Sequence, residues 1–463
     1  MNSFLFALVG FLITIGVIVL IHEGGHYLAA KWCGFAVKRF SIGFGPVIAR
    51  FRAWDTEFAL SVLPLGGYVM FDEGPENPMP AEKAHLMEHG PRWKRAIVIA
   101  AGPLMNFILA VILFAATGAM GVQDIVPYVA PKAGSQAEAL GVEPLDRVTA
   151  VGGRRVSGVT DLNFALVAHQ GEADVPIEFE RAHLSYGLPG EASGAVAGKP
   201  QVYVRHFDLT DVTPEQIEAN KGFAFPAAGL LLTGRGVMIS DVNAGSAAER
   251  AGFAKGDLVV EAAGRPADMT AFAQAIREHP GRAVAFSVRR ADGLHKIELV
   301  PDSRRDEKTG ADIGFAGVRY QPSIEFTTVR YSPLESVELA VWKVSRLTKI
   351  QADAVAGMAE GTVSTDNLSG PVGIASAAGD AARGGAAALI EFIALISVAV
   401  GFMNLIPIPA LDGGQLVVLG IEGAMRRDLP KSAKEKIAAV GAAILIAIFL
   451  FCTWNDLGRA FGG

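Results

Sequence analysis

The chain has 463 residues, of which 51% are hydrophobic and only 19% charged, whereas soluble domains carry about 25% charged residues. The high apolar content excludes an intrinsically disordered chain, and the net charge of -6 does not favour nucleic-acid binding, which normally needs a basic surface. Cys33 and Cys452 are the only cysteines, so no disulfide framework holds the fold. This composition indicates a membrane protein.

Four stretches without charged residues are long enough to cross a bilayer, which takes about 20 apolar residues. They are residues 1–21, 96–123, 392–411 and 437–455. The first stretch lacks a basic n-region and a small-residue cleavage site, so it indicates a retained span rather than a signal peptide. We therefore expect a multi-pass α-helical protein with four transmembrane helices, at residues 1–30, 96–123, 386–412 and 437–455.

Basic residues predict the orientation of these spans. Residues 31–95 hold nine Lys or Arg, and residues 413–436 hold five. By the positive-inside rule both loops are cytoplasmic. We therefore expect both termini, and the long segment 124–385 between spans two and three, to lie on the outer side of the membrane.

The external segment contains an internal repeat with a constant offset of 111 residues. Gly134 begins G-S-Q-A-E-A-L-G and is followed by D-R-V, while Gly245 begins G-S-A-A-E-R-A-G and is followed by D-L-V. Short strand patterns and a helix pattern around each copy fit a small α/β module. The repeat resembles PDZ domains and predicts two tandem PDZ-like domains, at residues 124–222 and 223–320. Such domains bind a peptide as an added strand or serve only as a steric cover.

Two further segments belong to the external region. Residues 183–200 are rich in Gly, Ala and Ser and indicate an insertion in the first PDZ-like domain. Residues 321–385 lie next to the membrane, and positions 334–360 within them follow a helical pattern.

The first span ends in a motif that suits a metal ion. His22-Glu23-Gly24-Gly25-His26 matches H-E-x-x-H. On a helix both imidazoles share one face and can bind one ion, and Glu23, one position away, can reach a water molecule beside it. Ionisable groups inside a span are costly and mark function. The alternative is two unrelated histidines at a helix end.

A catalytic zinc site needs a third protein ligand. Asp412 follows the third charge-free stretch as His22 follows the first, each after about 20 apolar residues, so both lie at a comparable depth. Pro407 and Pro409 interrupt the helix there and free backbone beside a cavity. We therefore expect Asp412 to be the third ligand. An ordinary loop position or a helix cap is the alternative.

Together these features resemble the site-2 protease family of intramembrane zinc metalloproteases. The resemblance rests on H-E-x-x-H in the first span, N-x-x-P-x-P-x-L-D-G at residues 404–413, and PDZ-like domains between spans two and three. It covers essentially the whole chain, and the metal motifs show no departure. Further matching segments are residues 43–46, 58–71, 101–107 and 369–373.

The resemblance implies a set of roles. His22, His26 and Asp412 would bind Zn²⁺. Glu23 would be the general base. Asn404 would bind the substrate backbone, although a hydrogen bond between helices is the alternative for this side chain.

The resemblance also implies partners and location. Residues 58–71, within the loop 31–95, would form a membrane-associated β-hairpin that pairs with an unwound substrate. That substrate would be a single-span membrane protein already cut on its outer side, such as an anti-sigma factor or a remnant signal peptide. The protein would lie in the lipid of a bacterial inner membrane, with periplasmic PDZ-like domains, an active site near the cytoplasmic side and no nucleic-acid partner.

Two other functional classes fit parts of the pattern. A non-catalytic membrane scaffold would use the PDZ-like domains to recruit partners, and its metal content would be zero. A transporter would explain the broken third span, but four spans without inverted repeats are not typical of one.

Overall fold

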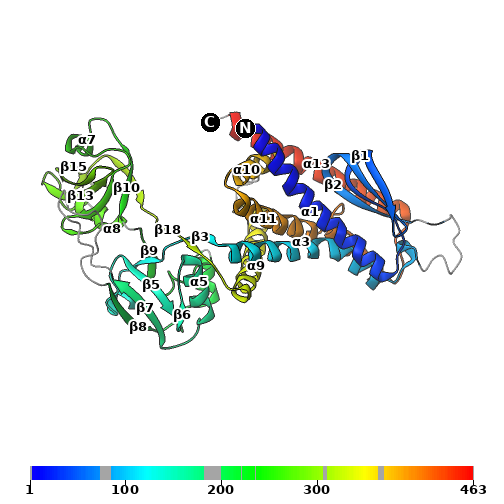
Figure 1. Ribbon diagram of the computed structural model, residues 1–463, viewed down its shortest axis with the longest axis horizontal. Coiled ribbons are helices and arrows are strands. Elements are labelled where there is room, and N and C mark those ends of the chain that lie inside the picture. The colour runs from blue at the N-terminus through cyan, green and yellow to red at the C-terminus, as the bar shows by residue number, and fades with distance from the viewer. Residues whose placement is uncertain are drawn as a thin grey trace. The chain divides into compact units, whose positions relative to one another are not determined.

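The computed structural model describes residues 3–72, 74, 85–181, 200–220, 222–234, 236–305, 310–362 and 370–461. All but the last residue of the insertion expected at 183–200 lies outside these ranges, as does Ser369. The chain forms two compact units, one of Met1–Val122 with Arg330–Gly463 and one of Gln123–Val329. The first unit is mostly helical and the second is built on sheets (Figure 1).

Within the described residues, the helical unit contains four helices that are long and apolar enough to cross a membrane, which confirms the four predicted spans. They are α1 (Ser3–Cys33), α3 (Arg92–Met120), α11 (Ala386–Leu405) and α13 (Lys431–Phe461). Leucines on α1 and apolar residues on α13 stay exposed, Leu20 and Leu450 among them. Large exposed apolar surfaces of this kind are suited to contact with lipid.

The third span is shorter than expected, because α11 ends at Leu405 rather than at residue 412. Ile406 has an extended backbone (φ −65°, ψ 141°), as expected for a residue that precedes a proline. The L-D-G motif instead begins a separate helix, α12 (Asp412–Met425), where a loop was expected.

The predicted ends of the other spans also differ from the structure. α3 begins at Arg92, and β3 (Val122–Ile125) begins within the expected second span. α13 begins at Lys431, six residues before the charge-free stretch. Charged residues therefore continue these helices beyond their apolar segments, which a criterion based on charge does not detect.

Close helix contacts hold the helical unit together. A Cβ atom added to Gly25 of α1 would lie 2.5 Å from the carbonyl oxygen of Ala101 in α3, so the two backbones are in direct contact. Ser397 of α11 donates a hydrogen bond to the carbonyl oxygen of Asn106 at 2.8 Å. The segment expected to be helical before span three forms α9 (Pro333–Ala359), with a capping box at Ser332, and α10 (Pro371–Arg383). α3 therefore packs against α1 and α11, and its apolar side chains also share a cluster with those of α9.

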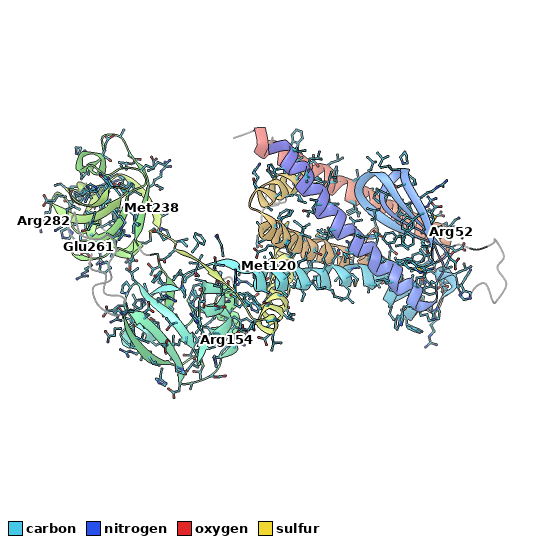
Figure 2. The ribbon with its side chains drawn as sticks, in the orientation of Figure 1. Arg52, Met120, Arg154, Met238, Glu261 and Arg282 are labelled. Carbon is cyan, nitrogen blue, oxygen red and sulfur yellow. The ribbon has the colours of Figure 1, made fainter. Side chains whose placement is uncertain are left out.

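Two long strands, β1 (Val37–Ala53) and β2 (Thr56–Phe71), follow α1 and form a hairpin. The segment 58–71, expected to form the hairpin by itself, lies within β2, and β1 supplies the other strand. Both strands bend back, so that the stretch 39–42 of β1 pairs on one side with residues 67–70 and on the other with residues 57–60. Arg52 lies on this hairpin (Figure 2). In the described chain, residues 67–71 pair with β1 only, so their other edge is open. A 3₁₀ helix, η1 (Met87–His89), leads into α3.

The second unit contains two six-stranded antiparallel sheets with the same strand order. The first has the order β8 (Gln201–Phe207), β7 (Val175–Arg181), β5 (Asp146–Val151), β4 (Tyr128–Pro131), β9 (Leu230–Leu232), with β6 (Arg154–Arg155) beside β5. The second has the order β14 (Gly293–Leu299), β13 (Val284–Arg290), β11 (Leu258–Ala262), β10 (Val237–Val242), β17 (Val318–Pro322), with β12 (Arg265–Pro266) beside β11. Figure 2 labels Arg154 in the first sheet and Glu261 in the second.

The helices of the two sheet domains also correspond, which confirms tandem PDZ-like domains. In the first domain α4 (Gln136–Ala139) and α5 (Val159–Ala168) match α7 (Ala247–Ala251) and α8 (Met269–Arg277) of the second. The first domain also has α6 (Pro214–Ala219), which has no counterpart among the described helices of the second. β9 completes the first sheet although it lies beyond residue 222, where that domain was expected to end. Two strand pairs lie outside the sheets, β15 (Asp302–Arg305) with β16 (Asp312–Phe315), and β3 with β18 (Phe326–Val329).

Candidate metal centre

Three side chains from two segments far apart in the sequence meet in the helical unit. His22 and His26 lie one turn apart on α1, and Asp412 is the first residue of α12. The two Nε2 atoms are 3.2 Å apart. Asp412 Oδ2 lies 3.2 Å from Nε2 of His22 and 3.5 Å from Nε2 of His26. The structure therefore brings together the three residues expected to bind zinc.

The spacing of these atoms suits a tetrahedral metal ion. Four ligand atoms at about 2.0 Å from zinc stand about 3.3 Å from one another, which matches the three separations. Asp412 is buried, and its Oδ2 has no hydrogen-bond partner among the described residues. A buried carboxylate oxygen without a partner is costly. A metal ion would satisfy it, so the residues present fit a zinc site with three protein ligands and one open position.

Glycines shape the walls of this centre. A Cβ atom on Gly102 of α3 would collide with Nε2 of His26 and would lie 2.9 Å from Cε1 of His22. Gly413 lies against the carbonyl oxygen of Leu405, and Gly414 lies against that of Ile408, both too close for a side chain. The glycines after Asp412 therefore allow the start of α12 to fold tightly onto the end of α11.

The far nitrogen of each imidazole contacts α3. His26 Nδ1 lies 2.8 Å from the carbonyl oxygen of Val98. His22 Nδ1 lies 3.1 Å from the side-chain nitrogen of Asn106. Such contacts orient metal-binding imidazoles. The sequence gives no signal for Val98, whose backbone alone takes part, and the motif that contains Asn106 did not reveal its partner.

Glu23 lies beside the hairpin. A Cβ atom on Gly67 of β2 would lie 2.8 Å from Cγ of Glu23, so the strand passes directly over this side chain. Gly67 belongs to the stretch 67–71, whose outer edge is open. A peptide added to that edge would thus run close to Glu23.

The structure does not bring Asn404 into the cluster of ligand atoms. Its side-chain nitrogen donates to the carbonyl oxygen of Val400 within α11, at 3.0 Å. Its role in substrate binding remains a prediction.

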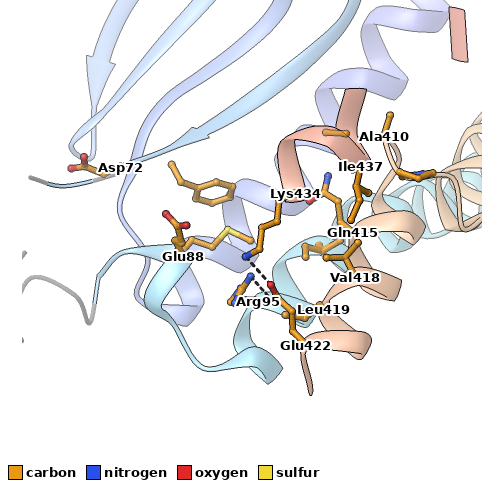
Figure 3. A pocket seen from close by; sticks show the side chains of 15 residues that line it. Asp72, Glu88, Arg95, Ala410, Gln415, Val418, Leu419, Glu422, Lys434 and Ile437 are labelled. Atoms are coloured by element: carbon orange, nitrogen blue, oxygen red, sulfur yellow. Dashed lines mark hydrogen bonds and ion pairs between the residues drawn. The ribbon is translucent and has the colours of Figure 1, made fainter. Parts of the chain in front are cut away.

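A second polar cluster, which sequence reasoning missed, lies at the other end of α12 and lines a cavity of about 520 Å³ (Figure 3). Glu422 is fully buried. Its carboxylate forms ion pairs with Lys434 at 2.8 Å and with Arg95 at 3.4 Å. It also accepts the backbone N–H of Leu429 at 2.9 Å. Burial raises the pKa of Glu422, but these partners outweigh burial and hold the pKa below its ordinary value.

Comparisons with known proteins agree with this geometry. The family model described as Peptidase family M50 matches residues 10–448. The regulator of sigma-E protease RseP of Escherichia coli is 31% identical over 471 residues, covering 99% of this chain and all of that protein. The regulator of sigma E protease of Salmonella typhimurium is 32% identical over 476 residues, with the same coverage. The counterpart in Haemophilus influenzae is 31% identical over 462 residues, again with that coverage. A membrane-spanning chain with this cluster and this full-length match belongs to peptidase family M50.

Proposed function

We propose that the protein is a zinc endopeptidase that hydrolyses a peptide bond within or near the transmembrane segment of single-span membrane proteins. The observation that carries this proposal is the convergence of His22, His26 and Asp412 at tetrahedral spacing, with Glu23 beside an open strand edge. An anti-sigma factor or a remnant signal peptide, cut earlier on its outer side, is the proposed type of substrate.

His22, His26 and Asp412 would hold the metal ion, and Glu23 has a separate role in proton transfer. When bound by His22, His26 and Asp412, zinc supplies a Lewis acid that activates water and polarises a carbonyl group. The Glu23 carboxylate takes a proton from the attacking water and gives it to the leaving amine. Because Glu23 is one residue away from His22, it lies beside the ligand set without belonging to it.

The hairpin provides a place for the substrate backbone. A helical substrate hides its peptide bonds in internal hydrogen bonds, so it must become extended before it is cut. The open edge of residues 67–71 offers free backbone groups to such an extended segment. Asn404 is proposed to bind the same segment. This arrangement would place the cut near Gly67, next to Glu23.

The proposed topology places the two PDZ-like domains on the outer side of the membrane. Basic residues in the loops around 31–95 and 413–436 favour a cytoplasmic position for those loops and for the nearby metal centre. The PDZ-like domains would then be periplasmic in a bacterial inner membrane. There they would restrict entry to substrates that had already lost their outer part.

The test compares the wild-type chain with Glu23→Gln. Candidate single-span proteins are co-expressed with each form, and released cytoplasmic fragments are detected. We expect cleavage by the wild type, none by Glu23→Gln, and equal zinc content in the two purified proteins.

Three results would contradict the proposal. Full cleavage by Glu23→Gln would remove the general base. A wild-type protein without zinc would favour a non-catalytic scaffold. Transport of a solute without any cleavage would favour a transporter.

A further inference from the structure

The two imidazoles of the metal centre differ on their far sides. His26 Nδ1 faces the carbonyl oxygen of Val98, which only accepts hydrogen bonds, so Nδ1 carries the proton and Nε2 is left with a free lone pair. His22 Nδ1 instead faces the side-chain nitrogen of Asn106, which only donates. If His22 binds a metal through Nε2, its proton must stand on Nδ1. Two donors would then face each other.

The other end of the same carboxamide has the opposite problem. Asn106 is fully buried, and its Oδ1 has no hydrogen-bond partner among the described residues. A half-turn of the carboxamide exchanges Oδ1 and Nδ2 with almost no change in shape. That rotation would point an unpaired acceptor at the proton of His22 Nδ1. One movement thus removes the clash of donors and gives Oδ1 a partner.

We propose that Asn106 is a positioning residue for His22. Its Oδ1 accepts the Nδ1 proton, which selects the tautomer and holds the ring with Nε2 toward the metal. Val98 does the same for His26 through its backbone. This inference rests on the proposed zinc site and adds a residue of α3 that touches no reacting atom.

The surroundings of Asn106 fix its position. Its carbonyl oxygen accepts a hydrogen bond from Ser397 of α11 at 2.8 Å. A Cβ atom on Gly401 of the same helix would lie 3.3 Å from Cβ of Asn106, so the two helices are in close contact there. The Asn106 side chain is therefore held between α1 and α11. A half-turn about its Cβ–Cγ bond does not require these contacts to change.

The test measures how fast zinc leaves the purified full-length protein when a chelator is added. All variants are made in the Glu23→Gln background, so the measurement does not depend on proteolysis. Asn106→Leu keeps the approximate size but offers no acceptor, and we expect zinc loss about 10- to 100-fold faster. Asn106→Asp keeps an acceptor oxygen, and we expect zinc loss no faster than in the parent.

A spectroscopic measurement separates positioning from general damage. With Co²⁺ in place of zinc, Asn106→Leu should change the visible absorption spectrum and Asn106→Asp should preserve it. Ser397→Ala is the matched control, because it removes a contact to the backbone of the same residue and leaves the carboxamide intact. Its rate of zinc loss and its spectrum should lie closer to those of the parent than to those of Asn106→Leu. If Asn106→Leu does not fold, Asn106→Ala takes its place.

Two outcomes would overturn the proposal. Retention of zinc at the parent rate by Asn106→Leu would show that His22 needs no orienting partner. Loss of zinc from Asn106→Asp as fast as from Asn106→Leu would show that the nitrogen, not the oxygen, matters. Failure of the proposed function is recognised separately, because there the parent itself would hold no zinc.

Discussion

α12 carries a buried carboxylate near each end, and the two are surrounded by opposite chemistry. Asp412 faces two imidazoles, and its Oδ2 has no hydrogen-bond partner among the described residues. Glu422 faces the cations Lys434 and Arg95 and accepts a backbone N–H as well. A buried charge must be neutralised. Among the described residues, no Lys or Arg side chain pairs with Asp412, and a bound metal ion would supply the positive charge there. Glu422 already has two cationic partners.

We interpret this difference as one between the proposed reactive centre and a structural cluster on a single helix. Without a metal ion, the first cluster would leave the Asp412 carboxylate uncompensated, while Glu422 connects α12 to α3 and α13 through Arg95 and Lys434. Variants of the two clusters test that division.

The largest effect is expected from Gly102→Ala. The added methyl group would collide with His26 and crowd His22, so the imidazoles could no longer converge on one ion. We expect zinc content to fall close to zero, with loss of peptidase activity, while helical content measured by circular dichroism is kept. Gly16→Ala on α1 is the control, because its Cβ meets nothing within 4 Å. Normal zinc content in Gly102→Ala would show that the centre tolerates a side chain there.

Glu422→Gln should have a different effect. It leaves Lys434 and Arg95 without their shared partner, and breaking a buried ion pair costs about 3–5 kcal/mol. We expect a clear drop in the thermal unfolding temperature in detergent, with zinc content unchanged at low temperature. Asp428→Asn serves for comparison, since Asp428 is 56% exposed where it pairs with Arg92 at 3.0 Å and with Arg95 at 3.8 Å, and an exposed pair contributes only about 0–1 kcal/mol. Zinc loss from Glu422→Gln under folded conditions would contradict the division.

The PDZ-like domains contain further buried carboxylates that, like Glu422, are neutralised by protein groups. They allow a test with a smaller expected effect. The Asp146 carboxylate accepts hydrogen bonds from Arg181, from Tyr203 and from the backbone N–H of Glu143. Its counterpart Asp257 in the second domain accepts hydrogen bonds from two groups among the described residues, the Arg290 guanidinium and the backbone of Ala254. Hydrogen bonds to charged groups are worth about 1.5–3 kcal/mol.

We therefore expect Asp146→Asn to destabilise its domain more than Asp257→Asn destabilises the other. Hydrogen exchange in the full-length protein would report each domain separately. If each substitution increased the exchange rate of its own domain over the wild type by the same factor, the extra partners of Asp146, Tyr203 among them, would contribute nothing. Neither variant should change the zinc content.

The smallest effect concerns pH. The pKa of Glu422 is held below its ordinary value of 4.5 by Lys434, Leu429 and Arg95, against the opposing effect of burial. Because the folded form holds its proton less tightly, the charge of Glu422 stabilises the fold fully above pH 4.5. That contribution is lost as the pH falls through the lowered pKa. The difference in unfolding temperature between the wild type and Glu422→Gln should shrink below pH 4.5, and a constant difference would contradict this.

Some of this protein could be predicted from the order of its residues alone. The four spans follow from apolar runs, because a bilayer imposes a minimum length on any helix that crosses it. His22 and His26 share a face because they are four residues apart. The repeat at Gly134 and Gly245 reveals two similar domains. These features depend on short-range geometry or on composition.

Other parts were decided only when distant segments packed together. Val98 contributes a carbonyl oxygen that every residue possesses, so no pattern could single it out. Gly102 matters because two imidazoles from another helix lie against it, and β9 joins the first sheet through backbone hydrogen bonds that do not depend on side chains. Glu422 became a structural group because helices that are remote in the sequence brought two cations to it. Such contacts are set by three-dimensional packing, which local periodicity does not encode.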